Sequence, residues 1–163
     1  MATYTPKPPR IISGPVDGFP IQEAAGQTYR AGEFLTPTAG PDIFSKAGTG
    51  ATLVSAGKLV IAAKHAQNLS ATGKNEAIEI VPDATKIRIC ATGAAATAAN
   101  TATGTQYGVT TTTVNGVPIH TLDLTNTTNL ALKIIRFSQS SDNGFVGDTN
   151  VFVDAEFLPA VTL

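Results

Sequence analysis

An Asn-Gly pair between two alternating segments constrains the fold of this chain more than any other feature. Residues 106–114 and 117–124 alternate apolar or β-branched side chains with polar ones, which is the period of a half-buried β-strand. Asn115-Gly116 separates the two segments, and this pair favours a two-residue turn because both positions tolerate positive φ. The pattern therefore predicts an antiparallel hairpin.

Pro118 restricts the second strand of this hairpin. Because proline has no backbone N–H, within sheets it is found in edge strands or at bulges. The apolar positions also change parity between Ile119 and Leu122, which favours a bulge. We therefore expect either an edge strand or a bulged strand after the turn.

Short apolar runs bounded by turn residues predict further strands. Residues 76–81 and 86–90 each alternate, and the four residues that join them are typical of a second hairpin. The isoleucines of these two segments would share one inner face: Ile78, Ile80, Ile87 and Ile89. The remaining predicted strands are residues 28–35, 58–64, 130–137 and 151–158. Residues 130–137 are apolar on both faces, so we expect them in the interior of a sheet.

Together these elements predict an all-β fold, a small β-barrel or sandwich-like domain with long loops. At 163 residues, the chain is expected to form one β-rich domain over residues 21–163, preceded by an arm. Two stretches are predicted to be loops: the Ala/Thr-rich residues 91–104, expected to be mobile, and the turn-rich residues 138–150. Charged residues make up only 14% of the sequence and threonine is abundant, which suits a β-structure.

Residues 1–20 are predicted to form an extended N-terminal arm. Prolines hold their own φ and keep the preceding residue extended, so this segment cannot be helical. The prolines that impose this are Pro6, Pro8, Pro9, Pro15 and Pro20. Two interpretations stay open at this point: a disordered tail, or an arm that becomes ordered on a neighbouring molecule by adding a strand to an exposed sheet edge.

The titratable residues give no pattern of a catalytic or metal centre. A zinc site needs three or four ligands, and neither His65 nor His120 has them at local spacing. Neither histidine accompanies a recognisable nucleophile motif, and Cys90 lies in an alternating segment that suits a structural thiol. Residues 142–148 resemble a calcium loop superficially, but Gly144 occupies a ligand position, so a turn is expected. We therefore expect no enzyme activity, no cofactor and no metal ion.

Charge and hydropathy limit the partners that the chain can have. The formal net charge is −1, so the sequence lacks the basic footprint of a nucleic-acid-binding protein. No apolar run approaches the roughly 20 residues that a membrane-spanning helix needs. Residues 1–20 also lack the apolar centre of a secretory signal. We expect neither nucleic acid nor a membrane as partner, and synthesis in a cytoplasm.

Four segments, taken in order, resemble the decoration (cement) proteins of tailed-bacteriophage capsids, the lambda-type head decoration group. The segments are residues 25–35, 57–63, 107–109 and 151–158. The resemblance implies a small β-rich protein, usually a homotrimer, on three-fold or quasi-three-fold axes of the expanded capsid. It also implies an N-terminal arm that pairs with strands of the major capsid protein.

From this resemblance we expect a viral structural protein on the capsid exterior of the virion. It would bind the outer surface of the expanded phage capsid and stabilise it by cementing neighbouring major capsid protein subunits. The capsid-binding residues would be those of the arm: Pro6, Pro8, Pro9, Arg10, Ile11 and Ile12. The alternative is a phage tail- or fibre-associated adhesin, or carbohydrate-binding β domain, which the low aromatic content of 6% disfavours.

Overall fold

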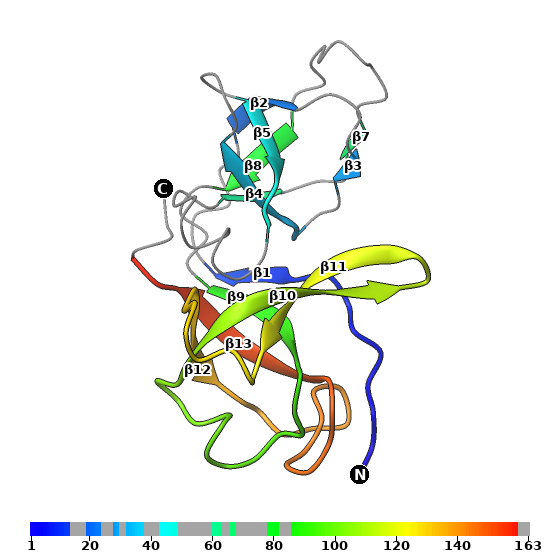
Figure 1. The fold of residues 1–163 in the computed structure, drawn as a ribbon, viewed down its shortest axis with the longest axis vertical. Coiled ribbons are helices and arrows are strands. Elements are labelled where there is room, and N and C mark those ends of the chain that lie inside the picture. The colour runs from blue at the N-terminus through cyan, green and yellow to red at the C-terminus, as the bar shows by residue number, and fades with distance from the viewer. Residues whose placement is uncertain are drawn as a thin grey trace.

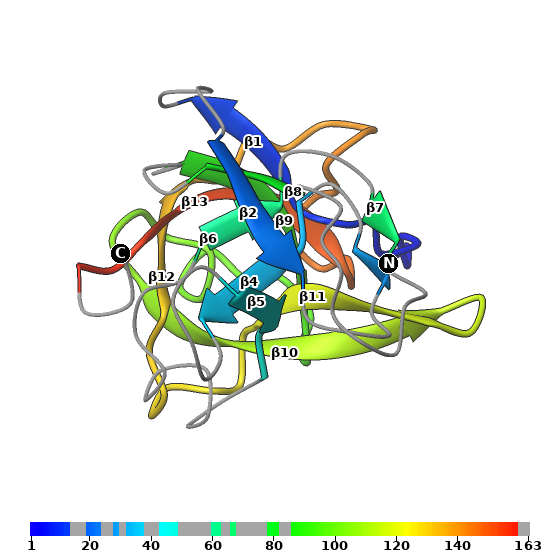
Figure 2. The ribbon, with the colours of Figure 1, turned by 90° about the horizontal axis from the view of Figure 1, so that it is seen from above.

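The structure is a computed structural model that describes residues 1–13, 19–23, 28–29, 32–37, 43–48, 60–62, 66–67, 78–81 and 86–159. In this part of the chain every regular element is a β-strand, which confirms the predicted all-β fold. Figure 1 shows two groups of strands, one above the other, with the N-terminus at the lower end. Figure 2 shows the same strands from above and places β1 (Arg10–Ser13) at the rim of the molecule.

The lower group is a six-stranded sheet in the order β1-β9-β11-β10-β12-β13, counted over the described residues. Its other members are β9 (Lys86–Thr92), β10 (Gln106–Val114), β11 (Val117–Asp123), β12 (Leu132–Arg136) and β13 (Val151–Phe157). Because β13 also pairs with β9, five of the strands form a closed circuit around a buried interior. Ile87, Ile89, Leu122, Leu132 and Ile134 are completely buried in it.

The upper group contains a closed barrel with the strand order β2-β5-β4-β6-β8. Its strands are β2 (Phe19–Glu23), β4 (Phe34–Pro37), β5 (Ile43–Lys46), β6 (Val60–Ala62) and β8 (Ile78–Val81). A separate two-stranded sheet pairs β3 (Thr28–Tyr29) with β7 (Ala66–Gln67). The barrel confirms the prediction of a small β-barrel.

Phe34 joins the barrel to the core of the six-stranded sheet. Although Phe34 belongs to β4, its side chain is completely buried within the core cluster of the lower group. Its ring stacks on His120 of β11 at a centroid distance of 4.9 Å and meets Phe157 edge-on at 5.0 Å. Aromatic pairs in this range stabilise a fold beyond the area that they bury.

The Asn-Gly hairpin is confirmed. β10 and β11 pair in continuous register from Gly108↔Asp123 to Val114↔Val117. The turn residues have positive φ, 51° at Asn115 and 78° at Gly116, as a type I′ turn requires. The hairpin projects from the body of the molecule in both views (Figures 1 and 2).

The bulge expected near Pro118 is wrong, and β11 is not an edge strand either, because it lies between β9 and β10 in the sheet. The register of β11 with β10 does not shift, and β11 pairs with β9 only at Leu122 and Asp123. Pro118 therefore pairs with β10 but lies beyond the residues of β11 that pair with β9, so its missing N–H costs no hydrogen bond to β9. The apparent change of parity arises because residues 119–122 are all buried, on both faces of the strand.

The second predicted hairpin is also wrong. β8 pairs with β2 and β6 in the barrel, whereas β9 pairs with β1, β11 and β13. The four isoleucines therefore lie in two different sheets. Alternation specifies which residues of a strand share a face but leaves the pairing partner open. The connecting residues 82–85 lie outside the described part.

The segment 28–35 is two strands where one was expected. β3 and β4 are separate, and Gly32 lies in a turn between them with φ of 90°. A Cβ on Gly32 would lie 1.6 Å from the carbonyl oxygen of Pro9, so the arm passes directly against this glycine. Of the predicted strand 58–64, residues 60–62 are β6 and the others lie outside the described residues.

The remaining strands and loops predicted for the second half are confirmed, except that residues 91 and 92 of the predicted loop 91–104 belong to β9, and the mobility of this loop stays a prediction. β12 and β13 occupy the segments predicted as strands, and β12 lies between β10 and β13 as an interior strand. Residues 93–104 and 138–150 contain turns and bends and no regular strand. The first loop is tied to the body by Ala96 N donating to Asp148 O (2.8 Å) and Gly104 N donating to Ile134 O (2.8 Å).

Candidate binding surface at the N-terminal arm

The first residues of the arm lie along the loop before β13. Thr149 N donates to Ala2 O (2.9 Å), and Tyr4 N donates to Thr149 O (3.1 Å), which forms a short parallel bridge at Thr3. The amide of Asn150 adds a bond to Tyr4 O (3.0 Å). These contacts anchor the start of the arm to the body of the chain.

The arm then adds a strand to the sheet. β1 pairs antiparallel with β9 through Arg10↔Arg88, Ile11↔Ile87 and Ser13↔Lys86. Ile11 packs against the core cluster, and the register shifts so that Ile12 has no partner in β9. Residues 10–13 therefore form an ordered strand, but the sheet that receives it belongs to the same chain, so strand addition to a neighbouring molecule stays a prediction.

The predicted capsid-binding residues differ in how far they are exposed. Pro9 is buried beside Gly32, and Arg10 is exposed. The others are half-buried: Pro6, Pro8, Ile11 and Ile12. β1 stands at the end of the strand order, so its second edge is unpaired among the described residues. Arg10 and the free edge of β1 are thus available to a partner, while buried Pro9 fixes the position of the arm.

Sequence reasoning missed a row of charges that crosses four strands beside the arm. Cross-strand pairs place Arg10 opposite Arg88, Arg88 opposite Asp154, and Asp154 opposite Arg136. The bulge in β12 between Ile134 and Arg136 turns the Arg136 side chain to this outer face. The row became visible only once the strand register was known.

Asp154 is the centre of this row. Its side chain is 3% exposed, and it accepts from Arg88 Nε (2.8 Å) and from Arg136 Nε (2.9 Å) and Nη2 (2.6 Å). Burial on its own would raise the pKa of Asp154, but the hydrogen bonds and charges of the two arginines outweigh it, so the pKa is lowered. The carboxylate stays ionised and holds both guanidinium groups in fixed positions.

A second row lies one step along the same face. Lys86 is opposite Glu156, and Glu156 is opposite Lys133, whose Nζ lies 2.6 Å from Glu156 Oε1. Lys86 is exposed. We call the two rows, together with the adjoining Lys7 and Asp142, the charged face. Its members are Lys7, Arg10, Lys86, Arg88, Lys133, Arg136, Asp142, Asp154 and Glu156.

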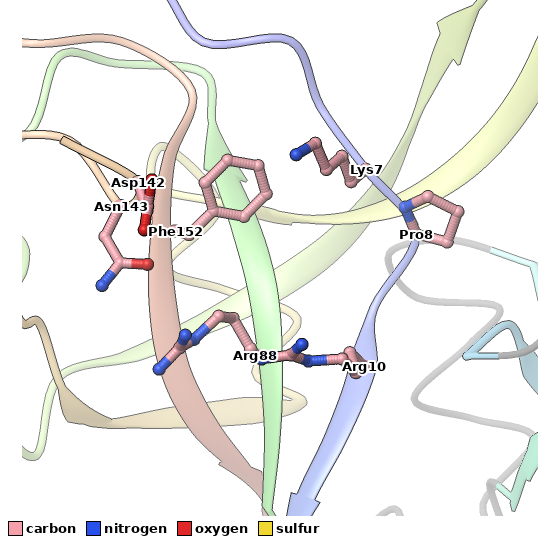
Figure 3. A pocket seen from close by; sticks show the side chains of 7 residues that line it. All are labelled: Lys7, Pro8, Arg10, Arg88, Asp142, Asn143 and Phe152. Carbon is pink, nitrogen blue, oxygen red and sulfur yellow. The ribbon is translucent and has the colours of Figure 1, made fainter.

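Two hollows open on the charged face and share Arg88. The first has a volume of about 280 Å³ and lies between the arm and the outer side of β9 and β13 (Figure 3). Its lining comprises Lys7, Pro8, Arg10, Arg88, Asp142, Asn143 and Phe152. Figure 3 shows Arg10 directed from β1 toward β9, and Lys7 directed toward Phe152. The second hollow, about 480 Å³, includes Ile12, Lys86 and Arg136.

Of the side chains considered for catalysis, His120 and Cys90 are buried in the fold. His120 is buried, and burial lowers its pKa to about 4. Nδ1 lies 3.4 Å from the donating Phe34 N, and Nε2 therefore donates to Ala47 O at 3.1 Å. Cys90 is buried too, and burial raises its thiol pKa to about 12, which leaves it protonated. His65 lies outside the described residues.

No group of three or more His, Cys, Asp or Glu side chains within the described residues is arranged to hold a metal ion. The loop 142–148, considered as a calcium loop, is a turn in which Asp148 Oδ2 accepts from Phe145 N (3.0 Å) and Oδ1 from Ala2 N (2.5 Å). Within the same described residues, no helix has the length and hydropathy needed to cross a membrane.

No protein-family model, curated protein or solved structure matches the chain.

Proposed function

We propose that this chain is a non-catalytic structural protein that binds the outer surface of an expanded phage capsid and cements neighbouring major capsid protein subunits. The observation that carries the proposal is the position of the arm. β1 forms the end of a sheet, at the rim of the molecule, and its outer edge is unpaired among the described residues. This position supports a binding role for the arm, consistent with the family resemblance of the sequence.

An unpaired strand edge is a ready template for another chain. Its free N–H and C=O groups bind an incoming strand through the main chain, and neighbouring side chains supply specificity. The arm is anchored on both sides of Pro6, by the bridge at Thr3 and by pairing with β9. A pre-ordered edge loses little conformational entropy on binding, which favours a firm contact from a short strand.

Cementing follows from thermodynamic linkage. A protein that binds the expanded lattice and not the unexpanded one stabilises the expanded lattice by its binding free energy. In a homotrimer, three such contacts would act together, and multivalency of this kind raises affinity by about 10²–10⁴ over one contact. The stabilised shell would then resist the pressure of packaged DNA.

The test is co-sedimentation of the purified chain with expanded and unexpanded shells assembled from the major capsid protein of the same genome. We expect binding to expanded shells alone, and light scattering of the free chain to give the mass of a trimer. Ile12→Glu would place a negative charge in the free strand and weaken binding by about tenfold or more. Val114→Glu, at another half-buried β-branched residue, is the matched control.

Equal binding to both kinds of shell, or to neither, would overturn the cementing role. If Ile12→Glu bound expanded shells as tightly as Val114→Glu and the unaltered chain, the role of the β1 edge would be lost while cementing itself stood. If the free chain were a monomer and bound expanded shells but not unexpanded ones, the cementing role would stand and the homotrimer would be wrong.

A further inference from the structure

The charged face carries a net positive charge, whereas the whole chain carries a net negative charge. It gathers six of the eleven Lys and Arg residues but only three of the twelve Asp and Glu residues, while the chain carries a formal net charge of −1. Net positive charge on one face of a slightly acidic protein creates a local field that attracts negatively charged groups. This asymmetry calls for a partner that carries negative charge.

The excess of positive charge is concentrated on the side of the arm. On the β12 side, Arg136 and Lys133 are ion-paired with Asp154 and Glu156. On the β1 side, Lys7, Arg10 and Lys86 form no ion pair within the described residues. The uncompensated cations therefore lie on the arm and on the neighbouring strand β9, at the arm side of the charged face.

Arg10 and Arg88 stand directly opposite each other in the β1–β9 pair. Like charges at such positions repel, so this pair destabilises the docking of the arm in the free protein. Asp154 already binds Arg88 on its other side, through Nε and Nη2, and leaves Arg10 unneutralised. A carboxylate placed beside Arg10 would relieve this repulsion on binding.

We infer that the charged face binds an acidic, extended segment of a partner protein, laid along β1 with carboxylates toward Arg10 and Lys86. In an extended segment, side chains two residues apart are separated by about 7 Å. This spacing matches the two charge rows, which are themselves set two residues apart along β9 at Lys86 and Arg88. The identification of the partner as the major capsid protein rests on the proposed function.

The carboxylates of the charged face favour a protein partner over a nucleic acid. Asp142, Asp154 and Glu156 lie among the cations, and they would repel a continuous phosphate backbone. An acidic peptide segment carries discrete charges that can be placed opposite Arg10 and Lys86 alone. Phe152 in the first hollow also offers an apolar surface to the stem of a glutamate side chain.

The test uses a synthetic extended peptide that alternates Glu with Thr, a matched peptide with Gln for Glu, and a single-stranded oligonucleotide of similar length. Binding to the full chain is measured by fluorescence anisotropy. We expect the Glu peptide to bind, the Gln peptide to bind at least about fivefold more weakly, and the difference to shrink as ionic strength rises from about 0.05 M to about 0.5 M.

Two double variants locate the binding. Arg10→Gln with Lys86→Gln neutralises the uncompensated cations, and Thr111→Glu with Thr113→Glu lowers the net charge equally on the exposed end of the hairpin. We expect the first to weaken peptide binding about fivefold and the second to leave it within about twofold. Thermal unfolding of each variant confirms that these exposed positions leave the fold intact.

Equal affinity for the Glu and Gln peptides, equal effects of the two double variants, or tighter binding of the oligonucleotide would each overturn the inference. Repeating the variants on expanded shells separates it from the proposed function. If shells bind the unaltered chain and the Arg10/Lys86 variant equally, the acidic-segment inference falls and cementing stands. If the peptide binds as expected but no shell does, cementing falls and the acidic-segment site stands.

Discussion

At the scale of single residues, His120 connects the barrel to the six-stranded sheet. It belongs to β11, yet its ring stacks on Phe34 and its nitrogens bond to backbone atoms of Phe34 and Ala47, at the ends of β4 and β5. Nδ1 accepts a backbone N–H, a role that only the neutral ring can fill. Protonation of His120 would therefore remove one bond and place a charge in the core.

This arrangement makes stability dependent on pH. Burial lowers the pKa of His120 from its ordinary 6.5 to about 4, so the unfolded chain binds the proton more tightly. The stabilisation is fully present above about 6.5 and is lost as the pH falls toward about 4, for a total of about 3 kcal/mol. Urea unfolding across this window measures it.

His120→Gln is the control for the pH dependence, because glutamine can bond to the same backbone atoms but does not titrate in this range. Its free energy of unfolding should change much less between about pH 6.5 and about pH 4. Asp154 and Asp148 have pKa values lowered below their ordinary 3.8, so their contributions are lost at still lower pH. An identical pH dependence in wild type and variant would remove His120 from this role.

At the scale of elements, the β10–β11 hairpin depends on its turn. A Cβ at Gly116 would meet no atom within 4 Å, while φ at this residue is 78°. Gly116→Ala should therefore cost about 1 kcal/mol through backbone conformation alone, with no steric clash. Denaturant unfolding measures the loss, and Thr113→Ala, at an exposed hairpin residue, serves as control. Unchanged stability in Gly116→Ala would show that the turn tolerates another backbone geometry.

The hairpin could be predicted from sequence because its information is local. The turn residues and the flanking alternation lie within twenty residues, and they specify both pairing and register. The pairing of β8 with β2 and β6, and of β9 with β1 and β13, joins segments far apart in the chain. Alternation in residues 76–90 could indicate strands there, but it could not indicate that they enter different sheets.

The charged face was missed for the same reason. Lys86 and Arg88 alternate with isoleucines in one segment, and Asp154 and Glu156 alternate with small and apolar residues in another. This complementary pattern, with opposite charges at the same spacing, was the available signal that β9 and β13 are neighbours. The position of Arg136 on that face depends on a bulge, and nothing in the sequence of β12 indicates that bulge.

At the scale of the whole molecule, the arm is held between the two groups of strands. Pro9 is buried where its carbonyl passes Gly32, just before β4, and the following residues pair with β9 of the other group. The arm thus contacts both the approach to the barrel and the six-stranded sheet. Its docking depends on a glycine that lies more than twenty residues away in the sequence.

Gly32→Ala should release the arm. The new Cβ would lie 1.6 Å from Pro9 O, so either the arm or the turn before β4 must move, and φ at this residue is 90°. Trypsin can cut after Arg10 once β1 opens, and cleavage there should become about tenfold faster or more. Gly104→Ala separates clash from strain, because φ is 94° there but no atom lies within 4 Å of the added carbon. Its Arg10 cleavage should stay near the wild-type rate, since Gly104 bonds to Ile134 of β12 and not to Pro9 or β1. If both variants were cut after Arg10 at the wild-type rate, the contact with Gly32 would not be what keeps the arm on β9.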